Sequence, residues 1–496
     1  MTKRARAHTI EIEKPLQEKC GIVALYSPAY THTLKPALQA AGGVQHRGQY
    51  GAGLAMQARR GLITFKENGL LKEIFVPSIV KKFDQLTRWC LLHCRYGTHG
   101  NYNYLNLQPC IGTTADNEYF ALAHNGEFIV TEHPKKKSKH AEDGLSDTFL
   151  FSRLLGLQAA NNWDERVSTA LEQVTGAYSL VIGVKDALYV SRDRFGIRPM
   201  VLGKTDAFTV VASESHALDK INARLLREVQ RGEIVRIDKN GITTIKPGLE
   251  NRGHFCDFEW AYFARPDSTF PTQSHPQDAE RLSVYEFRER CGQILAREAP
   301  VKDATFVCGI PDSGPAISFG YAHALGVRTR QVIIRDHFDT NGTHRLFMRD
   351  DDKAAIEKKV LGKLSFIPDP HIWKDAVVVF CDDSIVRGNV TKRITHAARL
   401  LGAKAVHWII GFPAVMHRCY LGVSIRTREE LIAARNNGDL EKIAAEIGAT
   451  SVRYISSQGL VAARMPPKHI HHPTDAREFL LKNGGCGGCI TGLYPL

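Results

Sequence analysis

The segment 376-AVVVFCDDSIVRGNVTKR-393 constrains the fold of this chain more than any other part of the sequence. Its apolar start predicts a buried strand, which runs into Asp382 and Asp383, a short loop with Gly388, and a helix. Backbone N–H groups in such a loop suit a phosphate, while paired carboxylates at a strand end suit ribose hydroxyls and a Mg²⁺ ion that bridges a diphosphate. The alternative is an ordinary turn between strand and helix that happens to be acidic.

The second half of the chain repeats this alternation of strand and helix. Continuous apolar runs at 305–310, 330–334, 376–380 and 405–412 predict fully buried strands, and a helical pattern covers 390–402. We therefore expect an α/β domain whose parallel sheet is covered by helices on both faces.

The first half has a different pattern, and 496 residues are too many for one ordinary core. Short β-rich segments separated by glycine turns, with a helical stretch at 148–160, predict an α+β domain. The segment 266–278 is rich in Pro, Ser and Thr and is expected to connect the two domains. The strand candidates are 21–27, 119–128, 178–184, 187–193 and 209–215.

The formal charge of +13 raises the question of a nucleic-acid partner. Lys and Arg are spread along the chain without a long basic run, so we do not expect nucleic-acid binding. A basic surface also suits a small substrate that carries several phosphates. No apolar run reaches the length of a membrane span, and the N-terminus lacks the apolar core of a signal peptide. We expect a cytoplasmic protein with no membrane partner.

Cys20 opens an apolar strand pattern in 19-KCGIVALYS-27. Taken alone, it could equally be a small residue of the core. Four polar clusters beside predicted strand ends or turns favour a site instead, since loops at such positions can converge. They are 45-QHRGQYGAG-53, 95-RYGTHG-100, 124-HNGE-127 and 146-SDT-148.

In order and spacing these clusters resemble the class II, or N-terminal nucleophile, glutamine amidotransferase domain over residues 20–250. The resemblance implies that the Cys20 thiol attacks the glutamine amide and that its own α-amino group accepts the thiol proton. Residues 1–19 would then be a leader that must be removed. The Asn125 side chain and the Gly126 N–H are expected to stabilise the oxyanion. Glutamine binding is assigned to Arg95 on the α-carboxylate, Asp147 on the α-ammonium group, and Arg47 as a support near the nucleophile.

The segment DDSIVRG resembles the phosphoribosyl diphosphate motif of type I phosphoribosyltransferases, in the form found in the amidophosphoribosyltransferase family. Further matches are 196-GIRP-199, 211-VASES-215, 262-YFARPDS-268 and 310-IPDSGPAISFGYA-322. The implied reaction uses glutamine to convert 5-phosphoribosyl-1-diphosphate into 5-phosphoribosylamine at the start of purine synthesis. The implied substrate contacts are Asp312, Ser313, Lys363, Asp382, Asp383, Ser384, Arg387, Gly388 and Asn389, with one Mg²⁺ per subunit at Ser313, Asp382 and Asp383.

Two departures from the family pattern keep other functions open. Asn389 and Val390 stand where the family usually has two threonines, although Thr391 follows. The segment 336-DHFDTNGTHRLFM-348 keeps only Arg345 and Phe347 of the usual lid, and lids exclude water and order the substrate. The chain could therefore use another acceptor for the ammonia. It could also be a regulatory protein that senses nucleotides or phosphoribosyl diphosphate.

Eleven cysteines in an apparently intracellular chain do not suggest a disulfide framework. Cys486-Gly-Gly-Cys489, with Cys256 and Cys419, resembles the ligand set of the family branch that carries an iron–sulfur cluster. Four thiolates suit one 4Fe-4S cluster per subunit, and tetrahedral zinc is the chemical competitor. The cluster would pin the C-terminal tail.

The same resemblance sets the expected organisation of the whole chain. It divides the sequence into a leader (1–19), an amidotransferase domain (20–255), a phosphoribosyltransferase domain (256–480) and a tail (481–496). It also implies a homotetramer and inhibition by purine nucleotides.

Overall fold

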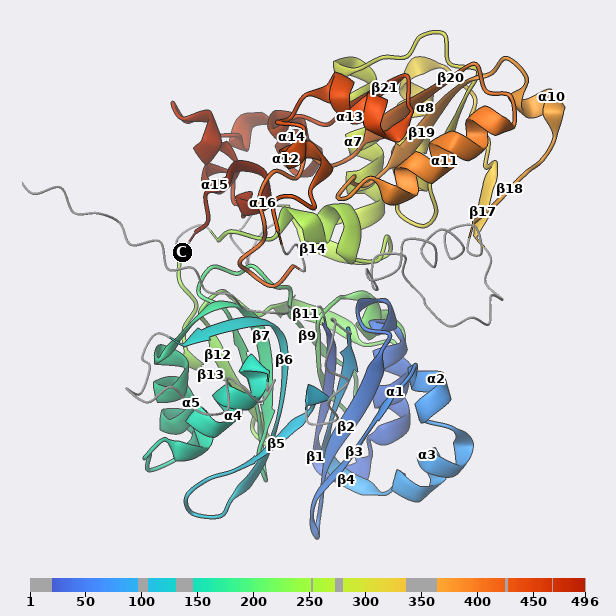
Figure 1. The fold of residues 1–496 in the computed structure, drawn as a ribbon. Coiled ribbons are helices and arrows are strands. Elements are labelled where there is room, and N and C mark those ends of the chain that lie inside the picture. Colours follow the sequence, from blue (N-terminus) through green and yellow to red (C-terminus); the bar gives the residue numbers. More distant parts are fainter. Residues whose placement is uncertain are drawn as a thin grey trace, which may run out of the picture.

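The computed structural model describes residues 20–96, 106–130, 146–250, 253–272, 280–335, 364–423, 427–465 and 467–495. The first domain is a sandwich of two β-sheets with helices on both outer faces, and the second domain lies across one end of it (Figure 1). In the described part of the chain, no helix has the length and apolar character needed to cross a membrane.

The first sheet has seven strands in the order β11-β9-β10-β1-β4-β2-β3. Its strand β1 begins at Cys20, so the predicted nucleophile lies at the end of a central strand. Every pairing in this sheet is antiparallel. The bounds are β1 (Cys20–His32), β2 (Gly51–Ala58), β3 (Gly61–Asn68), β4 (Leu86–Arg95), β9 (Val201–Lys204), β10 (Thr209–Ala212) and β11 (Arg224–Glu228).

The second sheet faces the first and has six strands in the order β13-β12-β8-β7-β6-β5. Alternate residues of each strand fill the space between the sheets, where Trp89 and Val181 are fully buried in one cluster. The bounds are β5 (Cys110–Thr113), β6 (Tyr119–Val130), β7 (Val174–Gly183), β8 (Leu188–Arg192), β12 (Ile234–Asp238) and β13 (Gly241–Lys246).

Helices cover the outer faces of this sandwich. On the first sheet, α1 (Leu34–Gly42) packs Leu34 and Ala37 against Val23, with α2 (Leu71–Ile74) and α3 (Pro77–Phe83) nearby. On the second sheet, α4 (Asp147–Leu157) and α5 (Trp163–Glu172) pack through residues such as Phe151 and Val167. Short elements at the strand ends are η1 (Gln45–Arg47) and α6 (His216–Asp219). The predicted α+β domain of packed sheets and helices is confirmed.

The second domain has a parallel sheet in the order β16-β19-β20-β21. The strands are β16 (Phe306–Gly309), β19 (Val377–Asp382), β20 (Ala405–Ile410) and β21 (Ser451–Tyr454). Successive residues point to opposite faces: Val379 packs toward α7 (Val284–Glu298) and α8 (Gly314–Leu325), while Val378 packs toward α11 (Asn389–Leu400) and α13 (Leu440–Ile447). The predicted α/β domain with helices on both faces is confirmed.

Two expectations about this half need correction. The run 330–334 does not form a strand of the parallel sheet. At its start, the Arg330 N–H donates to the Val307 carbonyl of β16 at 2.9 Å, beside an isolated parallel bridge between Thr329 and Val307. Its C-terminal end forms β17 (Ile333–Arg335), which pairs antiparallel with β18 (Leu364–Phe366). The described part of the expected connection at 266–278 is also ordered core. There β14 (Thr269–Pro271) pairs with β15 (Arg281–Ser283), and Phe270 is fully buried among aromatic rings.

The C-terminal tail folds back onto the start of the second domain. Phe255 pairs with Gly485, and the Cys486 N–H donates to the Phe255 carbonyl at 2.8 Å. Phe479 and Leu480 are buried in the same hydrophobic cluster as Trp260. The remaining elements are η4 (Glu259–Phe263), α10 (Pro370–Trp373), α12 (Ile432–Arg435), α14 (Ser457–Arg464), η5 (Pro467–His469), η6 (Ala476–Glu478), α15 (Phe479–Lys482) and α16 (Gly488–Thr491).

Candidate functional site

Cys20 is held by side chains at both of its backbone polar atoms. Its N–H donates to Asn125 Oδ1 at 3.1 Å, and its carbonyl oxygen accepts from Arg47 Nε at 3.1 Å. The residue is fully buried. In the unprocessed chain this N–H is a peptide group, and removal of residues 1–19, which lie outside the described residues, would turn it into the α-amine.

The neighbouring strand β6 carries two groups suited to an oxyanion. The Asn125 side chain is fully buried, and its Nδ2 has no hydrogen-bond partner in the described structure. An unmet buried donor costs about 1–3 kcal/mol unless a ligand satisfies it. Gly126 adopts φ +138°, where side chains are strained, and an added Cβ would collide with the Ala177 carbonyl. Asn125 therefore offers an amide donor near Cys20 that no group in the described part of the chain uses, as the predicted oxyanion role requires.

The predicted glutamine-binding residues Arg95 and Asp147 flank this position. Arg95 ends β4 and pairs directly with Cys20 across the sheet. Asp147 begins α4, where its carboxylate accepts the N–H groups of Phe128 and Thr148, each at 2.8 Å. Its side chain keeps 27% of its surface exposed, so the carboxylate stays accessible to a ligand.

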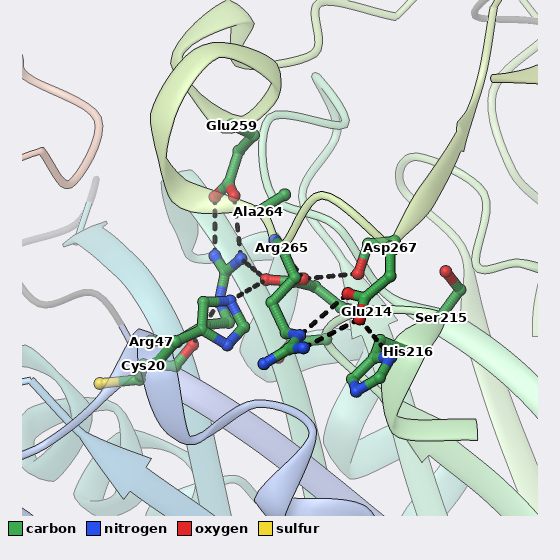
Figure 2. A network of polar contacts seen from close by, with 12 residues as sticks. Cys20, Arg47, Glu214, Ser215, His216, Glu259, Ala264, Arg265 and Asp267 are labelled. Atoms are coloured by element: carbon green, nitrogen blue, oxygen red, sulfur yellow. Dashed lines mark hydrogen bonds and ion pairs between the residues drawn. The ribbon is translucent and has the colours of Figure 1, made fainter. Parts of the chain in front are cut away.

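Arg47 lies near the nucleophile, as predicted, and its guanidinium is bound by two glutamates. Its guanidinium forms a fork with Glu259 (2.7 and 2.9 Å) and bonds Glu214 at 2.6 Å, as Figure 2 shows. Burial alone would lower the pKa of Arg47, but the two glutamates raise it above its usual value. The side chain is thus committed to protein groups. This arrangement places Arg47 as a support for the Cys20 backbone, and glutamine binding by Arg95 and Asp147 stays a prediction.

A cavity with a volume of about 410 Å³ lies at the carboxyl ends of the parallel strands. It brings together two loops that the sequence predicted, one after β16 and one after β19. The first domain reaches the same cavity through His46 in η1. The predicted residues that line it are Asp312, Ser313, Asp382, Asp383, Ser384 and Gly388, along with Val390 and Thr391.

The acidic pair lies on one wall of this cavity. Ser313 Oγ and Ser384 Oγ both donate to the Asp383 carboxylate, the second at 2.6 Å. Burial raises the pKa of Asp382 well above its usual value, and the charge of Asp383 adds to the rise. Gly388 caps α11 at φ +85°, which leaves the first N–H groups of that helix at the cavity.

Two of the predicted phosphoribosyl contacts that the structure describes are not among the residues that line this cavity. Arg387 points to Glu430, with Nε and Nη2 at 3.1 and 2.7 Å from its carboxylate. Asn389 is the first residue of α11 and is not among the lining residues. Lys363, and the lid at 336–348, lie outside the described residues.

The four predicted cluster cysteines line one small apolar cavity between the tail and the second domain. Burial raises the pKa of the Cys486 and Cys489 thiols, and the nearby Cys256 and Cys419 add to the rise. The Leu421 N–H donates to Cys419 Sγ at 3.3 Å. Among the described residues, no three His, Cys, Asp or Glu side chains are grouped closely enough to hold a single metal ion.

Comparison with known proteins identifies the family. Residues 104–220 match the model of a family described as a glutamine amidotransferase domain. The amidophosphoribosyltransferase of Synechococcus elongatus is 32% identical, over 97% of this chain and 92% of the relative. The human amidophosphoribosyltransferase is also 32% identical and covers 98% of both chains. This chain belongs to the amidophosphoribosyltransferase family.

The fold of the family agrees with the one described above. A Bacillus subtilis glutamine phosphoribosylpyrophosphate amidotransferase, solved with ADP and GMP, superposes with a TM-score of 0.79 at 30% identity, over 96% of this chain and 97% of the other. The predicted fold class and enzyme class, a glutamine-dependent amidotransferase of purine synthesis, are therefore confirmed.

Sequence reasoning missed several residues of these family sites. Arg288 lines the large cavity and donates to the carbonyls of Trp260 (3.1 Å) and Ala264 (2.9 Å), while burial lowers its pKa to about 10. His46 and Glu214 belong to segments that match the family, but no separate role was predicted for either residue. Their roles depend on contacts between segments far apart in the sequence, which no local pattern reveals.

Proposed function

We propose that this chain releases ammonia from glutamine at Cys20 and uses it to displace diphosphate from 5-phosphoribosyl-1-diphosphate. The products are 5-phosphoribosylamine, diphosphate and glutamate. The observation that carries the proposal is the pairing of a buried cysteine beside an unused amide donor with a cavity lined by Asp382, Asp383 and Ser313.

In the glutaminase half, the Cys20 sulfur attacks the amide carbon while the α-amine takes the thiol proton. The oxygen that becomes negative is stabilised by Asn125 Nδ2 and the Gly126 N–H, and such a donor typically contributes about 3–4 kcal/mol. Arg95 and Asp147 hold the two charged groups of the amino acid. Collapse of this intermediate releases ammonia and leaves a thioester, which water cleaves to glutamate.

In the transfer half, ammonia attacks C1 of the ribose and the C1–oxygen bond to diphosphate breaks. The ammonia must travel inside the protein, because neutral water would convert it to unreactive ammonium. His46 lines the phosphoribosyl cavity while the adjacent Arg47 contacts Cys20, so one short turn joins the two halves.

The residues on the cavity wall fit one Mg²⁺ ion per subunit, because carboxylate and hydroxyl oxygens are its preferred protein ligands. Asp382, Asp383 and Ser313 would hold it together with the substrate's diphosphate. A bound Mg²⁺ neutralises negative charge as the diphosphate leaves. The chain itself orients the ribose through the carboxylates, and the α11 N-terminus receives the 5′-phosphate.

The four cysteines fit a 4Fe-4S cluster, one per subunit. They are thiols around one cavity, and a backbone N–H already points at Cys419 Sγ, as is usual around cluster sulfurs. Cys256, Cys419, Cys486 and Cys489 would then pin the tail across the second domain.

The remaining features follow the family. We propose a homotetramer inhibited by purine nucleotides and located in the cytoplasm. The relative solved with ADP and GMP supports the nucleotide part.

The proposal is tested by incubating processed protein with glutamine, with and without phosphoribosyl diphosphate and Mg²⁺. Diphosphate release that depends on glutamine is the expected result. Glutamate formation that ignores the sugar phosphate would instead indicate another acceptor. Tight nucleotide binding without either product would indicate a sensor.

Removal of the leader is tested by mass spectrometry of the active protein. The expected mature chain begins at Cys20, because only then does the α-amine exist. An active enzyme that still carries residues 1–19 would contradict the proposed base.

A further inference from the structure

The contacts around Arg47 extend from the first domain into the start of the second. Glu259 is the first residue of η4, a π-helical turn in the segment that enters the second domain. Its carboxylate takes both arms of the Arg47 guanidinium across 212 positions of sequence. Figure 2 shows Arg47 between Glu259 and Glu214, with the Cys20 carbonyl turned toward it and the sulfur turned away.

We propose that Glu259 is a positioning residue of the glutaminase reaction. It holds Arg47 against the Cys20 carbonyl, so that the nucleophile is oriented by a residue of the second domain. The inference rests on the proposed function and adds a residue to its first half.

The physical argument starts from the two contacts on Cys20. Asn125 Oδ1 holds the nitrogen and Arg47 Nε holds the carbonyl oxygen. Together they fix the backbone rotation of a residue that has no preceding neighbour once the leader is removed. Without the second contact, residue 20 can turn about its Cα–C bond and move both its amine and its sulfur. Misplacement by about 1 Å can cost on the order of 100-fold in rate.

Arg47 can serve this role only if its guanidinium is itself fixed. Its side chain is 1% exposed, and the Glu259 and Glu214 side chains are fully buried. A two-bond fork between guanidinium and carboxylate sets the orientation as well as the distance. Glu214 contributes one bond at 2.6 Å and is shared with His46 at 2.8 Å, so the fork from Glu259 is the main orienting contact.

Glu259 is in turn fixed from two sides. Arg198 donates to it at 3.2 Å and, through its other nitrogen, to the Leu421 carbonyl at 2.8 Å. Arg288 anchors the same turn through the Trp260 and Ala264 carbonyls. Buried and held in this way, Glu259 keeps a lowered pKa despite its desolvation, because Arg47 lies beside it, and it stays ionised.

The test compares Glu259→Gln with the unaltered enzyme in two assays, one supplied with glutamine and one with ammonium salt at high pH. We expect kcat for glutamine hydrolysis to fall on the order of 10- to 100-fold. The KM for glutamine should change little, since Arg95 and Asp147 are untouched. Diphosphate release driven by external ammonia should persist, because it bypasses Cys20. Arg47→Lys, which keeps the charge but loses the fork, should show the same split.

A matched control is Glu233→Gln. Glu233 is buried and forms an equivalent fork with Arg227, at 2.7 and 2.8 Å, away from Cys20. It should leave kcat for glutamine hydrolysis within about twofold, because this pair, whose Arg227 side chain is 32% exposed, has no hydrogen bond to Cys20 in the described structure and should affect stability only.

Three outcomes decide the matter. Unchanged glutamine hydrolysis in Glu259→Gln and Arg47→Lys would overturn the inference while leaving the proposed function intact. Equal loss of the glutamine and ammonia reactions, with a lower melting temperature, would make Glu259 a structural residue and also overturn it. An unaltered enzyme inactive in both assays would instead refute the proposed function.

Discussion

The glutaminase site and the phosphoribosyl site are built in contrasting ways. At the first, strands β1, β4 and β6 bring Cys20, Arg95 and Asn125 together inside a closed sandwich, and side chains fix the nucleophile's backbone. At the second, loops surround an open cavity of about 410 Å³ with two adjacent carboxylates on its wall.

The difference reflects when charge appears in each reaction. The glutaminase oxyanion exists only at the transition state and its intermediate, so its donors must already be in place and unused. Phosphoribosyl diphosphate is strongly charged before it reacts. Its own phosphates, with Mg²⁺, can therefore complete the arrangement of Asp382 and Asp383 when it binds.

The largest expected effect is a loss of the transfer reaction without loss of glutamine hydrolysis. The double substitution Asp382→Asn and Asp383→Asn should lower diphosphate release about 1,000-fold, since metal-assisted charge stabilisation contributes several kcal/mol. The loss should be the same with glutamine or ammonia, while glutamate formation continues. Asp369→Asn, at a partly exposed helix cap in the same domain, is the control. A loss confined to the glutamine reaction would contradict the division between the sites.

The next largest effect is a loss of glutamine hydrolysis without loss of the transfer reaction. Asn125→Ala removes the unused Nδ2 donor and should lower kcat for glutamine hydrolysis about 100- to 1,000-fold. Ammonia-driven diphosphate release should remain near its normal rate. Asn162→Ala, which removes a helix cap on α5, controls for general weakening of the domain. Normal glutamine hydrolysis in Asn125→Ala would refute the oxyanion role.

A smaller effect concerns the C-terminal tail, which packs against the start of the second domain. Cys486→Ser should lower the iron content from about four atoms per chain and reduce the melting temperature, because one of four ligands is lost. Cys291→Ser, at an equally buried cysteine outside the cavity, should keep its iron. The measurement is the iron content of protein purified without oxygen. Colourless protein that contains zinc would contradict the assignment of a 4Fe-4S cluster.

The smallest effect is a pH dependence of the first domain alone. Burial lowers the pKa of His93 and of His124 to about 3, and in the unfolded chain both should titrate near the ordinary value of about 6.5. The unfolded state therefore binds more protons between these values, so the free energy of unfolding should fall as pH drops from about 6.5 towards 3.

Chemical denaturation at several pH values measures this dependence. His124→Gln should flatten it, because one of the two titrating groups is gone. A dependence identical to that of the unaltered protein would show that His124 is not buried in its neutral form.

The sequence predicted the parts of each site that lie within one short segment. The strand that ends at Asp382 and the turn at Gly388 follow from apolar length and loop chemistry, and β19 and α11 confirm both elements. The meeting of Cys20 with Asn125 was predicted only through the resemblance. Adjacent strands of different sheets give no periodic signal that would pair them.

Other features lay beyond sequence reasoning for physical reasons. The fork between Arg47 and Glu259 joins residues of two domains, and any buried arginine could have used another glutamate. The run at 330–334 contains the apolar sequence Val-Ile-Ile, yet its end pairs with Leu364–Phe366 outside the parallel sheet. Apolar composition predicts that a strand is buried, but it does not predict which strand it pairs with.

The most direct test of the central claim is Cys20→Ser assayed with each nitrogen source. A hydroxyl at this position is a far weaker nucleophile, so glutamine-dependent diphosphate release should disappear. Release driven by ammonia should continue at close to its normal rate, since Asp382 and Asp383 are untouched. Glutamine-dependent release that survives the substitution would contradict the claim that this sulfur supplies the nitrogen.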